Sequence, residues 1–375
     1  MLFAQNPSRH FRLMLAARVV VVLLTGSELS SADHPSADAN STNLSAPSTR
    51  AVDHDSLERA FASALQANGK EVLSILLPLN SSNLGDSDNQ ARACMIVRLS
   101  KHTLATSTTN DAVVAQLIAT YQEYWRRSLL GEHSAKDNEK WLLKALNRAV
   151  TTFSSRPAAS MDDIEPILES LVLKRGYHSL FGVTSPLREF MIWQVETEKR
   201  YDVALPEGPQ AVTVVLMDKF ASLGWAGFAT CDRQHTGGWA KPDRLYAVAS
   251  AYDQSSEDYR VSYLAHEGQH FSDLQRFQNL TQAELEYRAK LTELALAKST
   301  LYELLESFSG NEGDDIRVPH SYANGHVVSD MALRLGFQRN SLHNWRGIAI
   351  DRINQVAATL LREDTARLLR AHGNT

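Results

Sequence analysis

The sequence predicts an α+β fold that is mostly α-helical, and three observations lead to this prediction. Apolar residues recur at helical spacing over much of residues 56–205. Two short runs, 211–217 and 244–252, are instead typical of buried strands and are bounded by turn residues. From residue 257 onward the helical spacing returns. We therefore expect a helical region over 56–205, followed by a second domain over 206–375 with a small sheet and a helix pair.

The first 32 residues have the three parts of an export signal. Arg9 and Arg12 form a basic start, residues 13–25 are mostly apolar, and small residues stand at 30–32 where a signal peptidase could cut. No other stretch approaches the ~20 apolar residues that a membrane helix needs. We therefore expect an exported protein, periplasmic or secreted, with no integral span beyond a signal or anchor in residues 1–32.

Residues 33–55 are rich in Ser, Ala, Asp, Asn, Thr and Pro and lack periodic apolar residues, so they are expected to form a disordered linker. The region that follows contains no catalytic motif. Its helical spacing is seen over residues 57–65, 113–121, 142–150, 162–173 and 186–201.

Charge and cysteine content limit the classes of partner and compartment. The formal net charge is −5, and the sequence shows neither a long basic run nor a basic helix face. Nucleic acid is therefore not expected as a partner. Cys94 and Cys231 could pair in an exported protein, or they could be two free buried thiols, and the sequence leaves both open.

The chemistry is concentrated in His266-Glu267-Gly268-Gln269-His270. This H-E-x-x-H pattern falls inside a helix expected over 257–277, whose start would be a capping box formed by Ser255 and Asp258. Two histidines four residues apart share one helix face and can bind one Zn²⁺. Glu267 is then the general base and acid that acts on a water activated by the metal. Gly268 costs helix stability, which hints at a close approach by another part of the chain.

The third metal ligand is expected on the next helix. Thr281 and Glu284 form a T-x-x-E capping box there, which gives Glu284 a structural role. Glu286 is left without such a role, so it is the favoured ligand. Glu284, Glu293 and His326 remain open as alternatives.

These residues resemble the gluzincins, the thermolysin-like clan of zinc peptidases. The resemblance covers roughly residues 211–300, and Glu286-Tyr287-Arg288-Ala289 is similar to the third-ligand motif of membrane-associated members. Those families usually carry an Asp four residues after the ligand, a position that Lys290 occupies here. Without that Asp, the support it gives to a zinc-binding His is in doubt.

The resemblance implies two further features. A strand next to the cleft should bind extended peptide by β-augmentation, and 245–252 stands where such a strand belongs. A Tyr or His from the C-terminal part should donate to the developing oxyanion. Tyr322 and His326 are the candidates, and His235 is a weaker one.

The sequence thus predicts a zinc-dependent hydrolase that cleaves peptide bonds in peptide or protein substrates. His266, His270 and Glu286 would bind Zn²⁺, and Glu267, Tyr322 and His326 would be catalytic. Two alternatives stay open. One is a non-catalytic helical binding or scaffold protein, and the other is a zinc amidase that acts on a non-peptide or cell-wall amide.

Overall fold

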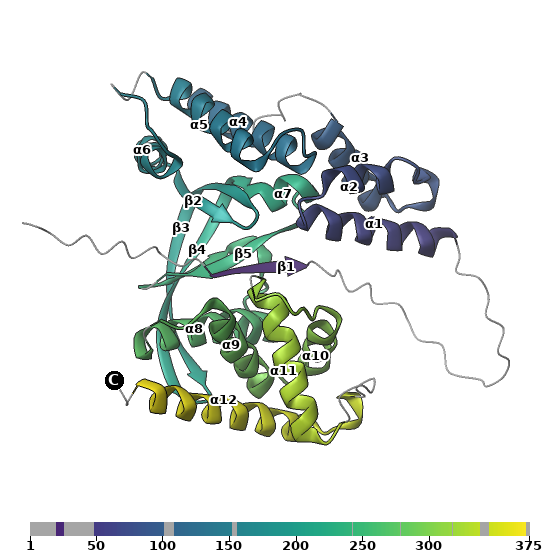
Figure 1. Cartoon of the computed structure of the whole chain (residues 1–375), viewed down its shortest axis with the longest axis vertical. Helices are drawn as coiled ribbons and strands as arrows, with labels where there is room; N and C mark the ends of the chain where they lie inside the picture. The colour runs from purple at the N-terminus through teal and green to yellow at the C-terminus, as the bar shows by residue number, and fades with distance from the viewer. Residues whose placement is uncertain are drawn as a thin grey trace, which may run out of the picture.

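A single mixed β-sheet crosses the middle of the molecule and separates two groups of helices (Figure 1). The structure, a computed structural model, describes residues 20–25, 49–100, 109–151, 156–241, 243–277, 279–316, 318–337 and 345–372. Helices before the sheet lie on one side of it, and helices after it lie on the other. The predicted α+β, mostly helical fold is confirmed.

The N-terminal helices pack around one apolar cluster that includes the buried rings of Tyr121, Trp125 and Trp225. Side-chain caps define several of their starts; Asp111, for example, accepts from the backbone N–H groups of Val113 and Val114. These helices are α1 (Thr49–Leu65), α2 (Gly69–Leu76), η1 (Ser81–Asn83), α3 (Asp86–Ser100), α4 (Ala112–Leu129), α5 (Ala135–Ala149) and α6 (Met161–Leu173).

The predicted linker and signal segment are described only in part. Helix α1 begins at Thr49, so the prediction of a linker is wrong for residues 49–55. Residues 20–25 of the expected export signal form strand β1 (Val20–Thr25). The rest of the predicted segments 1–32 and 33–55 lies outside the described residues.

The sheet has the strand order β1-β5-β6-β4-β3-β2. Strands β4 and β6 are parallel, and the other neighbouring pairs are antiparallel. After β1, the strands are β2 (His178–Thr184), β3 (Leu187–Leu205), β4 (Gly208–Leu223), β5 (Gln234–Ala240) and β6 (Leu245–Val248). The predicted strands over 211–217 and 244–252 correspond to β4 and to the shorter β6.

The prediction of a helix over 186–201 is wrong, because these residues belong to β3. The consecutive side chains from Phe190 to Trp193 are all buried. A strand that is buried on both faces has a continuous apolar run, which cannot be distinguished from a buried helix by spacing alone. Long pairing with the Val-rich β4 decides in favour of the strand.

The predicted boundary at residues 205/206 also changes. Strands β2 and β3 precede it but lie in the same sheet as β4, so the N-terminal helices end with α6. Helix α7 (Gly224–Thr230) follows β4 and packs among them.

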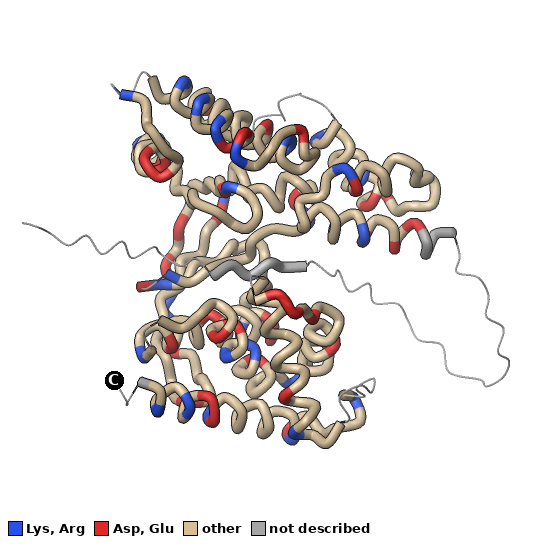
Figure 2. The backbone as a smooth tube through the Cα atoms, viewed as in Figure 1, with Lys and Arg blue, Asp and Glu red and all other residues tan. Residues whose placement is uncertain are grey.

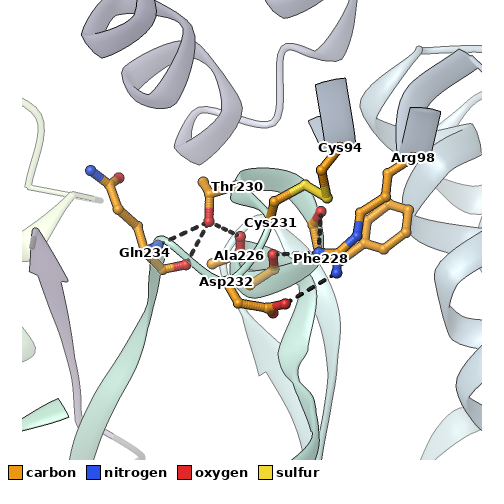
Figure 3. The surroundings of a disulfide bond; sticks show 9 residues. Cys94, Arg98, Ala226, Phe228, Thr230, Cys231, Asp232 and Gln234 are labelled. Carbon is orange, nitrogen blue, oxygen red and sulfur yellow. Dashed lines mark hydrogen bonds and ion pairs between the residues drawn. A yellow bond between two sulfur atoms is a disulfide. The ribbon is translucent and has the colours of Figure 1, made fainter. Parts of the chain in front are cut away.

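A disulfide joins Cys94 of α3 to Cys231, the residue after α7 (Figure 3). Beside it, Arg98 donates to the carbonyl oxygens of Gly227 and Phe228. The question that the sequence left open is therefore answered by the structure, where the two cysteines are paired. The N-terminal helices are covalently tied to the turn that enters β5.

The second helical group follows the sheet and has its own apolar cluster. It comprises η2 (Ala249–Ala251), the π-helix η3 (Tyr259–Ala265), α8 (His266–Arg276), α9 (Gln282–Leu296), α10 (Leu301–Gly310), α11 (Pro319–Leu335), η4 (Trp345–Gly347) and α12 (Ile350–His372). Among the described residues, no helix is both long enough and apolar enough to cross a bilayer.

Candidate metal centre

Helix α8 carries the H-E-x-x-H residues in its first turn and a half, and all of them are buried. The π-helix η3 leads directly into it. The capping box expected from Ser255 and Asp258 does not form. Instead Ser255 donates to Asp253, and the hydroxyl of Ser256 accepts from the backbone N–H of Tyr259. The helical segment therefore begins where the sequence predicted, but a different side chain caps it.

Helix α9 begins with the predicted capping box between Thr281 and Glu284. Leu280 and Leu285, the predicted staple residues, lie in one apolar cluster. The cap holds Glu284 at the helix end, whereas Glu286 faces α8 and is 1% exposed.

His266, His270 and Glu286 converge, each offering a ligand atom within 4.8 Å of the others. The two Nε2 atoms are 3.0 Å apart, and the Glu286 oxygens lie 3.4 Å from the Nε2 of His270 and 3.6 Å from that of His266. Ligands at ~2.05 Å from a tetrahedral zinc ion are about 3.3 Å apart. The three side chains therefore have separations that suit one such ion.

Glu293 lies behind this group and is not part of it. Its Oε1 is 2.6 Å from the Nδ1 of His266. A carboxylate can only accept, so Nδ1 donates to Glu293, and Nε2 is the nitrogen left for a metal ion once its own proton is lost. Lys290, at the position where the resemblance would place an Asp, packs over the ring of Phe308 instead. Glu293, one turn further along α9, supplies the supporting carboxylate.

Burial and mutual charge shift the pKa values of the group. Burial lowers the pKa of His266, but the carboxylates led by Glu293 outweigh it and raise the value to about 9. Burial raises the pKa of Glu267 to about 8. Burial also raises that of Glu286, yet the neighbouring imidazoles, first that of His320, bring it well below its ordinary value.

Glu267 is fully buried, and neither of its carboxylate oxygens has a hydrogen-bond partner among the described residues. The buried hydroxyls of Tyr252 and Tyr263 are likewise unpaired within the described part of the chain. Burial, and then the charge of Glu267, raises the pKa of Tyr263 well above its usual value. Burial and then the charge of Glu267 also raise the pKa of Tyr252, so both tyrosines lie within the electrostatic reach of Glu267.

A buried ionic network sets α8 against α9, and the sequence did not indicate it. Arg288 is fully buried and donates to both carboxylate oxygens of Asp273, at 2.8 and 2.9 Å. It also donates to Glu207, in the turn between β3 and β4, and to Asp364 of α12. In the sequence these charges look like ordinary helix-surface residues. Only the packing of three segments around Arg288 makes them a network that positions the metal-site helices.

The residues expected from the C-terminal part do not join the group as predicted. Tyr322 and His326 pair with each other, with ring centroids 4.4 Å apart, and line a separate cavity of about 690 Å³ with Tyr287 and Asp330. His320, from the same cluster of polar residues, is the one whose Nδ1 lies 2.8 Å from the Oε2 of Glu286. The sequence thus pointed to the right segment, but helix α11 turns a different residue toward the site.

The expectation that 245–252 forms a peptide-binding edge is wrong. Strand β6 is paired on both sides, with β4 and with β5. Strand β5 lies further out, and β1 pairs with its outer edge. His235 is a residue of β5, where its Nδ1 lies 3.0 Å from the carbonyl oxygen of Thr236.

Gly238 explains why β5 was not expected to be a strand. Two adjacent glycines, Gly237 and Gly238, suggest a loop in the sequence. In the structure, a Cβ at Gly238 would lie 2.5 Å from both the carbonyl oxygen of Tyr246 and the ring of Tyr263. Glycine is therefore required here because another strand and an aromatic ring approach the backbone closely.

Comparisons with known proteins add no relative. No model of a protein family matches the chain, and neither a curated protein nor a solved structure does. The resemblance to gluzincins accordingly rests on the motif residues alone. The chemistry has to be inferred from the geometry of the site.

Proposed function

We propose that this protein is a zinc-dependent hydrolase that cleaves peptide bonds. The observation that carries the proposal is the convergence of His266, His270 and Glu286 in a buried place, directly beside the unpaired carboxylate of Glu267. A helix surface without function would leave these groups solvated or separately paired, since burying polar groups without partners is costly.

The donor set favours zinc. Two imidazole nitrogens and one carboxylate are the ligands of many catalytic zinc sites, which keep a fourth position open. Both cysteines are in the disulfide, so no thiolate competes. Zinc bound there would supply a Lewis acid and a water of lowered pKa.

The chain's own residues would then divide the work. Glu293 holds His266 in the tautomer that keeps Nε2 free for the metal. Glu267, raised in pKa by burial, is suited to take a proton from an attacking water and to return it to the leaving amine. The Arg288 network holds the two helices that carry these groups in register.

We also propose export to an oxidising compartment. Disulfides persist in such compartments and are rare where thiols are kept reduced. The pairing of Cys94 with Cys231 therefore supports export, whereas the pairing of residues 20–25 with β5 does not support removal of residues 1–32 as a cleaved signal.

Metal analysis of point variants tests the site. Wild type should contain about one zinc per chain, and His270→Ala and Glu286→Ala should lose it. Glu284→Ala is the matched control, because the same kind of side chain is removed two residues away, where it caps α9 and pairs with Arg367; it should keep the metal. Wild type that takes up no zinc even after reconstitution would sink the proposal.

Activity tests the role of Glu267 separately. Glu267→Gln should keep zinc yet lose about 10²–10⁴-fold in peptide hydrolysis, the contribution of a general base. Cell-wall fragments should be assayed beside the peptides. Cleavage of the fragments alone would replace the peptidase by an amidase, and full activity of Glu267→Gln would overturn the assigned base.

A further inference from the structure

Helix α5 carries a row of basic side chains that the search for charge runs did not predict. Lys136, Lys140, Lys144 and Arg148 follow one another at intervals of four residues and are all exposed. Figure 2 shows them as successive blue turns of α5. The expectation that no helix has a basic face is therefore wrong. It failed because acidic, polar and apolar residues separate the four charges along the sequence.

These four positive charges are not fully neutralised by their neighbours. Within the described part of the chain, none of the four forms an ion pair. Of the two acidic residues of the helix, Glu139 pairs with Arg188, while Asp137 accepts from the neutral hydroxyl of Ser134 and still offsets one of the four positive charges. Four cations thus face solvent along about 18 Å of helix.

A groove of about 520 Å³ runs beside this row. Lys140, Lys144 and Arg148 line one wall, and Arg156 stands on the segment that follows. Asn147 holds that segment in place, because its side-chain oxygen accepts from the N–H of Ala158 at 2.7 Å and its nitrogen donates to the carbonyl of the same residue.

The lining of the groove indicates the chemistry of its ligand. It contains no carboxylate, and its apolar part comes from Leu143, Val150 and Pro157. Neither Glu139, adjacent to Lys140 in the sequence, nor Asp162 and Asp163 in the first turn of α6 is among the lining residues. The groove therefore suits an anionic group that carries an apolar portion.

We propose that the basic face of α5 and this groove bind the phosphate headgroups of anionic lipids at a membrane surface. The row is longer than the groove, since Lys136 lies beyond the lining residues. A single soluble phosphate would engage only part of it, whereas a lipid surface presents many phosphates to all four cations. The proposal is independent of the zinc site, which lies on the opposite side of the sheet.

Vesicle binding of the full chain tests the proposal. At low salt, the protein should bind phosphatidylcholine vesicles that contain about 30 mol% of the anionic lipid phosphatidylglycerol. It should not bind vesicles of phosphatidylcholine alone. Each cation contributes roughly five-fold, so Lys140→Glu/Lys144→Glu should weaken binding by at least about 25-fold. Raising the salt to about 0.5 M should weaken wild-type binding strongly, because screening shortens the reach of the charges.

The matched control is Lys70→Glu/Lys174→Glu, which changes the net charge equally at two exposed lysines away from α5. This variant should bind like wild type. The N-terminal apolar segment is present in the wild type and in both double variants, so it cannot cause a difference in vesicle binding between them. Thermal melting of each variant checks that all are folded.

Three outcomes would overturn the proposal. The first is equal binding to neutral vesicles, and the second is equal loss in both double variants. The third is tight binding of inorganic phosphate, or of a DNA duplex of about 20 base pairs, which is long enough to span the row, together with no binding to vesicles. That result would assign the groove to another anion.

Discussion

Glu286 has three imidazole neighbours, and two of them converge with it in the candidate metal group. His266 and His270 have Nε2 atoms within 4.8 Å of each other and of the carboxylate, whereas His320 does not belong to that group. His320 is 43% exposed on its side chain, and its Nδ1 lies 2.8 Å from Oε2. It therefore holds the carboxylate from the solvent side, as a positioning residue.

Replacing His320 should weaken the metal site without removing a ligand. We expect His320→Ala to raise the zinc dissociation constant about 10–100-fold, the usual effect of losing a partner of a ligand. Competition with a chromogenic chelator would measure it. His326→Ala is the control on the same helix, since its ring pairs with Tyr322, and it should leave zinc affinity unchanged. Equal effects of both variants would contradict the assignment.

Glu189 is a buried carboxyl group outside the metal site, far from it in the sequence and in a different role. It is 2% exposed, and its Oε1 accepts from the backbone N–H groups of Phe190 and Trp225. Burial raises its pKa from 4.5 to about 7. Gly224, whose φ is +82°, leaves it room, because a Cβ there would lie 2.1 Å from Oε1.

Glu189→Gln should therefore change how stability depends on pH. Between about pH 4.5 and 7 the unfolded chain loses the Glu189 proton while the folded chain keeps it, so wild-type stability falls as pH rises. Gln does not titrate, and the variant should gain about 3 kcal/mol relative to wild type across this window. Chemical denaturation at pH 4.5 and pH 8 measures the change. A stability difference that is independent of pH would refute it.

At the scale of elements, helix α8 has a glycine that its surroundings do not require. A Cβ at Gly268 would meet side-chain atoms of Leu205 and Val203 at 3.7 Å, which is ordinary contact. The expectation of a close approach at this position is thus wrong. The glycine costs helix stability without a compensating fit.

Gly268→Ala should therefore stabilise the protein by about 0.5–1 kcal/mol and leave zinc content unchanged. The midpoint of thermal unfolding measures it. Gly224→Ala serves as the opposite control and should be strongly destabilising, because of the clash with Glu189 and its positive φ. A destabilised Gly268→Ala would show that the contacts with Leu205 and Val203 are tighter than this.

At the scale of the whole molecule, the disulfide connects the N-terminal helices to the sheet across 137 residues of chain. A disulfide stabilises the folded state mainly by restricting the unfolded chain, and this stabilisation increases with the length of the loop that it closes. Cys94→Ala/Cys231→Ala should therefore lower stability by about 2–5 kcal/mol. It should keep about one zinc, because α8 and α9 hold the ligands. Thermal unfolding and metal analysis check both parts, and loss of zinc would show that the two sides of the sheet are coupled.

The sequence by itself determined what depends on local chemistry. The spacing of His266 and His270 follows from the period of the helix, and the cap formed by Thr281 and Glu284 left Glu286 to face the histidines. The helix period and the cap need only contacts within a few residues along the chain. The mostly helical α+β class followed from the same local periods.

Only the tertiary structure decided the rest. Glu293 supports His266 across 27 residues, and Arg288 meets Asp364 across 76. Such contacts depend on how helices dock, which no local period encodes. The strand β3 was misread because burial on both faces removes the alternation that marks a strand. His320 was chosen over Tyr322 and His326 because the rotation of α11 against α9 is set by packing between the helices.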